Sequence, residues 1–292
     1  MRLAKPAGNA TRARLELATA TLLLSTGGAA IKFSELTAWQ IASYRSAVAA
    51  AAFLLFLPAA RRALRPRSFA IGAAQASTMI TFVTANKLTT AAATVYLQST
   101  APLYLLALAP WLLREWPTRD DLVFMAALAA GLLLLLAGDQ SPLATAPDPA
   151  TGNAIAALSG ITWALTVLGL RWLGRNGESA PAQAATAAGN AIAFLVCLPA
   201  ALAAPVAVSA EPLLNGAVIA YLGLFQIALP YVLLTRALRA LPAIEASLFL
   251  LLEPVLNPLW AWLVQGEIAG WATLAGGAVI LGATAARILR SG

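Results

Sequence analysis

The chain carries ten separate runs of mostly apolar residues, and each run has the length of a membrane-spanning helix. About 20 such residues in a helix cross the hydrocarbon core of a bilayer. Breaks rich in proline or arginine separate the runs, as at Pro58 and at Trp116-Pro117. The runs cover residues 14–32, 37–57, 68–86, 90–112, 120–138, 151–171, 181–204, 213–234, 242–264 and 269–288. We therefore predict an all-α membrane protein with ten transmembrane helices.

The composition agrees with a membrane protein and excludes several classes of function. Hydrophobic residues make up 60% and charged residues 11% of the chain, against about 45–50% and about 25% in soluble domains. There is no histidine and a single cysteine, Cys197, which excludes imidazole catalysis, histidine-bound metals and an internal disulfide. The sequence has no phosphate-binding P-loop for ATP hydrolysis. We expect no metal, no cofactor and no enzyme activity.

The basic residues predict the orientation of the chain in the membrane. With the N-terminus in the cytoplasm, sixteen of the 19 Lys and Arg residues fall in cytoplasmic segments. Only Lys32 and Lys87 fall outside, and Arg45 lies within the second run. Positive charge marks the cytoplasmic side, so we expect both termini to be cytoplasmic in the cell (inner) membrane. The first run follows four basic residues like a signal peptide, but without a visible cleavage site we expect it to be retained. Because the charge lies in short loops, we do not expect nucleic acid as a partner.

The two halves of the chain resemble each other. A shift of 152 residues places Pro102 on Pro254 and Glu115 on Glu267. Each half holds five runs, an odd number, so the second half would be inverted in the membrane relative to the first. We predict one five-helix repeat over 1–139, an external linker over 140–150 and a second repeat over 151–292. Inverted repeats are typical of secondary transporters, which bind substrate where the repeats meet.

The corresponding segments TAAATVYLQSTAPLYLLALAPWLLRE (90–115) and PAIEASLFLLLEPVLNPLWAWLVQGE (242–267) carry a family resemblance. With the ten runs and the Glu253-Pro254-Val255 triplet, the chain resembles the EamA branch of the drug/metabolite transporter superfamily. More narrowly, the Leu-Gln-Ser-Thr-Ala-Pro run is similar to that of YddG-type aromatic amino acid exporters. The resemblance implies a ten-helix bundle around a central cavity lined by the first, third, fourth, sixth, eighth and ninth runs. It also implies alternating access and export from the cytoplasm.

Aromatic and neutral polar residues in the middle of the runs are the candidate substrate-binding residues. Aromatic rings far from the membrane interface can stack on planar solutes and bind cations. Each ring can instead serve in helix packing or lipid contact. Neutral polar groups at a similar depth can orient a solute. The predicted substrate-binding residues are Thr78, Phe82, Tyr96, Ser99, Trp163, Phe225, Gln226 and Phe249.

Two charges and three prolines inside the runs need a separate explanation. Arg45 can bind a substrate carboxylate, or it can serve as a structural tie to carbonyl groups or a carboxylate. Glu253 can bind a substrate ammonium, carry a coupling proton or pair with Arg45. Prolines free backbone carbonyls within a helix, so Pro102, Pro230 and Pro254 are predicted kinks. Glu115 and Glu267 are expected to anchor the ends of their runs.

These features favour a secondary transporter that exports small metabolites, with aromatic amino acids and related planar compounds as the expected substrates. The alternatives are an exporter of another metabolite class, or an enzyme or flippase acting on a lipid-linked substrate. The expected partners are the substrate and the lipid bilayer. Small residues in the fifth and tenth runs, among them Gly131 and Gly282, predict close packing between helices. That packing can lie within a monomer or across a homodimer interface.

Overall fold

The computed structural model describes residues 7–112, 118–138, 141–174, 180–205, 211–237, 241 and 249–290. Within these residues the chain is almost entirely helical, and the β-structure is limited to an isolated bridge between Leu143 and Ala146. The helices are α1 (Ala7–Ser25), α2 (Gly27–Phe33), α3 (Ala38–Phe56), α4 (Pro58–Arg62), α5 (Pro66–Leu88), α6 (Ala91–Gln98), α7 (Ala101–Leu112), α8 (Arg119–Ala137), α9 (Pro149–Gly174), α10 (Ala180–Ala203), α11 (Pro212–Tyr221), the π-helical η1 (Leu222–Ala228), α12 (Leu229–Ala237), α14 (Leu252–Gln265) and α15 (Trp271–Arg290).

Six helical stretches within the described ranges are long and apolar enough to cross a membrane. They are Pro66–Leu88, Arg119–Ala137, Pro149–Leu170, Ala180–Ala203, Pro212–Leu234 and Trp271–Arg290. The prediction of an all-helical membrane protein is therefore confirmed. The other four predicted runs correspond to α1 with α2, α3, α6 with α7, and α14. These four are shorter, less apolar or interrupted, and the count of ten spans stays a prediction.

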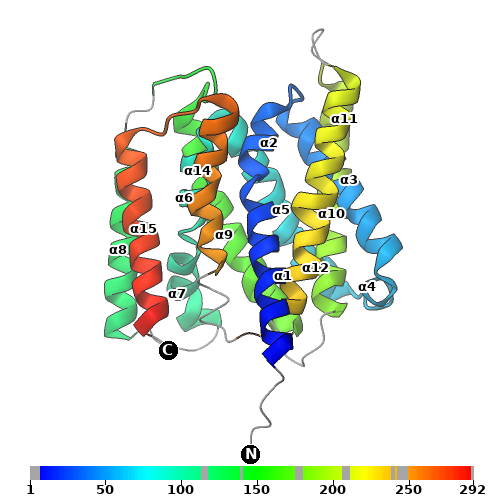
Figure 1. Ribbon diagram of the computed structural model, residues 1–292, viewed down its shortest axis with the longest axis horizontal. Helices are drawn as coiled ribbons and strands as arrows, with labels where there is room; N and C mark the ends of the chain where they lie inside the picture. The colour runs from blue at the N-terminus through cyan, green and yellow to red at the C-terminus, as the bar shows by residue number, and fades with distance from the viewer. Residues whose placement is uncertain are drawn as a thin grey trace, which may run out of the picture.

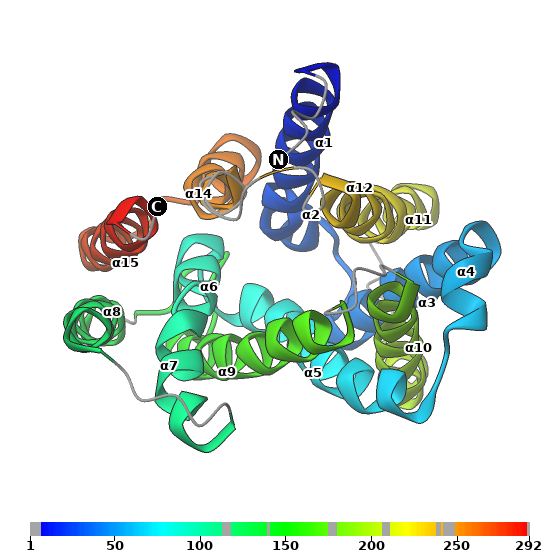
Figure 2. The same cartoon turned by 90° about the horizontal axis from the view of Figure 1, so that it is seen from below.

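The helices form two rows when the bundle is viewed along its helix axes (Figure 2). One row contains α15, α14, α1 and α12, and the other contains α8, α6, α9, α5, α10 and α3. Within the rows α5 packs against α9 and α10, and α1 packs against α12 and α14. The start of α1 and the end of α15 lie at the same end of the bundle (Figure 1). The rows thus bring residues from both halves of the chain to face each other.

Glycines allow the closest helix contacts, as the small residues of the fifth and tenth runs predict. A Cβ added to Gly131 of α8 would lie 2.9 Å from the Gly276 carbonyl oxygen of α15. The corresponding atom on Gly72 of α5 would lie 2.8 Å from the Gly189 amide nitrogen of α10. At Gly282 such an atom would meet nothing within 4 Å. Gly131 therefore packs α8 against α15 within one chain.

The two halves interrupt their helices at corresponding positions. In the first half the chain breaks at Ser99 and Thr100, between α6 and α7. In the second half it turns at Leu251, immediately before α14. Ser99 and Leu251 are 152 residues apart, the spacing that also relates Pro102 to Pro254. Each proline thus lies in the first turn of the helix that follows the break, where its missing amide hydrogen costs no intrahelical bond.

Pro230 explains the π-helical segment η1. In an α-helix its ring would clash with the carbonyl group four residues earlier, that of Gln226. The chain widens to a π-helix over Leu222–Ala228 and returns to an α-helix at Leu229, as expected where a wider turn relieves such a clash. A Cβ added to Gly27 would lie 2.7 Å from the Gln226 side-chain nitrogen. The wide turn therefore presses Gln226 against the start of α2.

A buried ion pair joins four segments at the end of the bundle opposite the two described chain ends. The Lys32 ammonium lies 2.9 Å from Glu267, and the two side chains are 4% and 2% exposed. Lys32 also donates to the carbonyl oxygens of Thr89 and Thr145, and Glu267 accepts the Ala91 backbone N–H at 2.7 Å. Glu267 thus ties the end of its helix to neighbouring segments. Its predicted counterpart Glu115 lies outside the described residues.

Candidate functional site: a cavity between the helix rows

A cavity of about 450 Å³ lies between the two rows of helices. The helices of the first half that contribute to its walls are α1, α3, α5, α6, α7 and α8. Those of the second half are α9, η1, α12, α14 and α15, so both halves of the chain contribute. Arg287 and Ile288 line it in the last turn of α15, so it extends toward the end where the described chain begins and ends. The opposite end is closely packed, since a Cβ on Gly28 would lie 2.7 Å from the Asn257 side chain. The cavity therefore extends toward the end of the bundle where α1 begins and α15 ends, and close packing closes it toward the other end.

Most of the cavity surface is apolar, and four aromatic side chains contribute to it, one of them Phe124 of α8. Phe82 of α5 and Tyr231 of α12 are buried, and Trp163 of α9 is half-buried beside them. Met79 supplies a thioether, and sulfur is a polarizable neighbour for aromatic rings. The other apolar lining residues are Leu24, Val95, Ala101, Pro102, Ile227, Leu234, Leu250, Leu251, Pro254 and Ile288. A volume of this kind suits a small planar solute.

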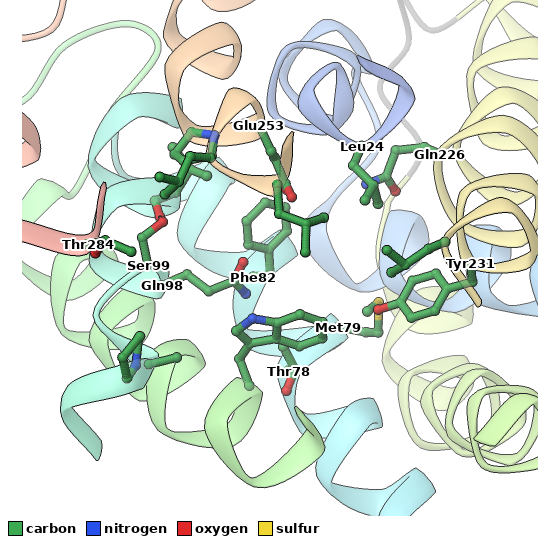
Figure 3. Close-up of a pocket in the computed structure, with 18 of the residues that line it drawn as sticks. Leu24, Thr78, Met79, Phe82, Gln98, Ser99, Gln226, Tyr231, Glu253 and Thr284 are labelled. Atoms are coloured by element: carbon green, nitrogen blue, oxygen red, sulfur yellow. The ribbon is translucent and has the colours of Figure 1, made fainter. Parts of the chain in front are cut away.

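Neutral polar groups are placed around the apolar wall. Thr78 donates to the Ala74 carbonyl oxygen and lies 3.3 Å from the Thr166 hydroxyl. The Gln98 amide donates to Ser159 at 2.7 Å, which leaves its oxygen available toward the cavity. Ser99 donates to the Val95 carbonyl oxygen at the helix break. Figure 3 shows Gln98, Glu253 and Tyr231 projecting toward the same space from three different helices.

Arg45 lies in the cavity wall, and the residue as a whole is only 1% exposed. It donates to the Gln226 side-chain oxygen and to the Met79 carbonyl oxygen, each at 3.3 Å. Its third nitrogen, Nε, has no hydrogen-bond partner in the described part of the chain. No carboxylate of the described residues forms an ion pair with it. The guanidinium therefore holds α3, α5 and η1 together through neutral acceptors.

Glu253 has a different environment, in the first turn of α14. Its carboxylate faces the cavity (Figure 3) and forms no ion pair with any described residue. Arg287, the third charged group of the wall, is paired with Asp121 at 2.7 Å. Glu253 is thus the one charged lining side chain, among described residues, without a hydrogen-bonding or ionic partner.

Four of the predicted site residues lie away from the cavity wall. The Tyr96 ring packs against Gly277 of α15 in the core between α6, α8 and α15, where a Cβ added to Gly277 would collide with the ring. Phe225 is 47% exposed on the outer face and stacks on Tyr221 with ring centroids 5.9 Å apart. Phe249 packs against the apolar cluster between α1 and α12. Pro230 shapes η1 and does not itself line the cavity.

The remaining predicted residues all line the cavity: Thr78, Phe82, Ser99, Trp163, Gln226, Arg45, Glu253, Pro102 and Pro254. The prediction left out Met79, Gln98, Tyr231, Phe124 and Thr284, which line it as well. Gln98 and Tyr231 carried a usable signal, since each is a polar-tipped side chain in the middle of an apolar run. Met79 and Phe124 carried none, because an apolar residue in an apolar run can face lipid, a neighbouring helix or a cavity.

Comparison with known proteins identifies the family. The EamA-like transporter family matches residues 15–137 and again residues 150–287. The chain belongs to the EamA-like transporter family. A search of curated proteins finds no match. A solved crystal structure is similar over 96% of this chain and 97% of the other, with a TM-score of 0.63 and 18% sequence identity. That likeness shows a shared fold.

Family membership gives the cavity its general role. The matching family consists of transporters, and its domain occurs twice in this chain. The walls of the cavity come from both matched regions, since Arg45 and Phe82 lie in the first and Trp163 and Glu253 in the second. The protein is therefore a membrane transporter, and the cavity is its candidate site for a small substrate.

Proposed function

We propose that this protein is a secondary transporter that exports aromatic amino acids and related planar compounds from the cytoplasm. The observation that carries the proposal is the apolar cavity with Trp163, Phe82 and Tyr231 in its wall, between the two halves of a transporter-family chain. The resemblance to YddG-type exporters of aromatic amino acids supports the substrate class and the outward direction.

The size and lining of the cavity support a small, flat substrate. About 450 Å³ is within the usual range for sites that enclose a small molecule. An aromatic ring in an offset or edge-to-face arrangement gains about 0.5–1.5 kcal/mol beyond the burial of its area. Neutral groups such as Gln98, Ser99 and Thr78 can orient the polar end of the substrate. Such a site binds through shape and stacking and accepts several related rings.

The packing supports alternating access with the present shape open toward the cytoplasm. Basic residues predict that the start of α1 and the end of α15 are cytoplasmic, and the cavity extends toward that end. The ion pair of Lys32 and Glu267 closes the other end. Export then requires this closed end to open while the cytoplasmic end closes. The inverted repeat supplies two related halves that can rock about a central site.

The test is transport by the purified protein reconstituted in lipid vesicles. Trp163→Ala removes a stacking face, so we expect labelled phenylalanine or tryptophan flux at low concentration to fall roughly tenfold, near the upper end of the aromatic-pair energy. Alanine flux should fall less. The matched control is Trp271→Ala, because Trp271 is exposed at the start of α15 and lies outside the cavity. Aromatic recognition at Trp163 would be refuted if Trp163→Ala and Trp271→Ala lost the same share of phenylalanine flux. It would also be refuted if Trp163→Ala lost the same share of phenylalanine flux and of alanine flux.

A further inference from the structure

The charged side chains of the cavity wall differ in whether they already have an ionic or hydrogen-bonding partner. The structure places three charged side chains there among the described residues: Arg45, Arg287 and Glu253. Arg287 is neutralised by Asp121 at 2.7 Å. Arg45 is engaged by two neutral acceptors and is 1% exposed. Only the Glu253 carboxylate faces the space without a partner of its own.

A substrate can complete the bonding of Glu253 only if it brings a hydrogen-bond donor, ideally a cation. An ammonium group provides three N–H donors and a positive charge, and bonds between ionised partners are roughly twice as strong as neutral ones. Gln98 and Tyr231 lie around the same space and can accept further N–H bonds (Figure 3). The aromatic wall of Phe82 and Trp163 remains free for a ring attached to that ammonium.

A substrate carboxylate has no comparable partner. Arg45 is the only guanidinium in the described wall without a carboxylate beside it. Two of its five N–H groups donate to Gln226 and Met79. Its Nε–H has no partner among the described residues, but Arg45 as a whole is 1% exposed, so the wall covers the remaining donors. A carboxylate that enters the cavity therefore gains little direct contact with Arg45, and it is repelled by Glu253.

We infer that the cavity recognises its substrate through an ammonium group held by Glu253, so that aromatic amines without a carboxylate are ligands and aromatic acids without an ammonium are not. This inference rests on the proposed function, because it names the chemical group read at the same site. It adds aromatic monoamines to the substrates and assigns the polar end of an amino acid to α14. The ring then lies toward α5 and α9.

The experiment measures equilibrium binding of labelled phenethylamine to the purified full chain in detergent, with 3-phenylpropionate and phenylalanine as competitors. We expect phenethylamine and phenylalanine to bind within about tenfold of each other and 3-phenylpropionate to compete more than tenfold less well. Glu253→Gln should weaken phenethylamine binding at least tenfold, which corresponds to about 1.4 kcal/mol. Glu253→Asp keeps the charge and should retain most of the binding. The matched control is Glu16→Gln, at an ion pair with Arg12 on α1 outside the cavity.

Each outcome decides for or against the inference. No binding of phenethylamine to the unmodified protein, or equal binding to Glu253→Gln, overturns it. Equal competition by 3-phenylpropionate also overturns it, since that result requires a site for the carboxylate. If Glu253→Gln does not fold, a folded Glu253→Ala variant takes its place, and we expect it to lose phenethylamine binding while Glu253→Asp retains it. Equal binding of phenethylamine to the unmodified protein, Glu253→Ala and Glu253→Asp overturns the inference. Amine binding without any amino acid flux in vesicles would leave the inference standing and refute the proposed export of amino acids.

Discussion

Breaking the ion pair between Lys32 and Glu267 should cost more stability than any exposed charge change in this protein. Both side chains are almost fully buried, at 4% and 2% exposure, and their charged atoms lie 2.9 Å apart. Removing one partner of a buried pair leaves an uncompensated charge, which costs about 3–5 kcal/mol. Lys32→Met also frees the carbonyl oxygens of Thr89 and Thr145. We therefore expect Lys32→Met to destabilise the folded state by about 3–5 kcal/mol.

The double variant separates the charge effect from the loss of hydrogen bonds. Lys32→Met with Glu267→Met buries no charge, but it leaves the Ala91 amide without its acceptor. A buried donor without a partner costs about 1–3 kcal/mol. The double variant should therefore lose less stability than the sum of the two single variants, by several kcal/mol.

The assay is reversible unfolding in mixed micelles, in which the fraction of an ionic detergent is raised and the helix signal is followed. Glu16→Gln serves as the control, because the Arg12–Glu16 pair is largely exposed on the Arg12 side and joins residues one turn apart. Such surface pairs contribute at most about 1 kcal/mol. If Lys32→Met costs no more than Glu16→Gln, or if the single losses simply add, the pair does not hold the closed end together.

Two other predictions follow from the packing and the charge pattern. Gly277→Ala should destabilise the protein by about 1–3 kcal/mol, because the new methyl group meets the Tyr96 ring. Gly282→Ala should be close to neutral, because nothing lies within 4 Å of a Cβ added there. Equal thermal unfolding temperatures for the two variants would contradict this packing. An Ala144→Cys variant on a Cys197→Ala background should react with an impermeant maleimide from outside intact cells, whereas Leu289→Cys should not. Protection of residue 144 with labelling of residue 289 would reverse the proposed orientation.

The helical stretches were predictable because an apolar run of a given length has one stable form in a bilayer. The break at Ser99 was indicated by Pro102, and the break before α14 by Pro254. The break at Thr26 carried no such signal, since no proline lies near it. There Ser25 and Thr26 donate to the carbonyl oxygens of Leu22 and Leu23, and side-chain bonds of this kind bend a helix. The Gly27-Gly28 pair directly after Thr26 is the sequence signal for this break, although glycines and hydroxyl residues also occur in straight helices.

The site was only partly predictable for a related reason. Trp163 and Phe82 line the cavity, whereas Tyr96 and Phe225 do not, although all four lie in the middle of apolar runs. A helix that is apolar on all sides gives no periodic signal for the face that turns inward. Tyr96 instead follows the register that brings its ring onto Gly277. Such a pairing joins residues far apart in the chain, and it becomes visible only in the folded structure.

The most direct test of the central claim is counterflow in vesicles that contain the unmodified protein and one of four labelled amino acids. The account predicts saturable, protein-dependent exchange of phenylalanine and tryptophan that exceeds the exchange of threonine and alanine. Exchange must also be accelerated by unlabelled substrate on the opposite side, as expected of a carrier with one central cavity. Equal fluxes of all four amino acids, or fluxes no higher than in protein-free vesicles, would contradict the assignment of aromatic amino acids to this cavity.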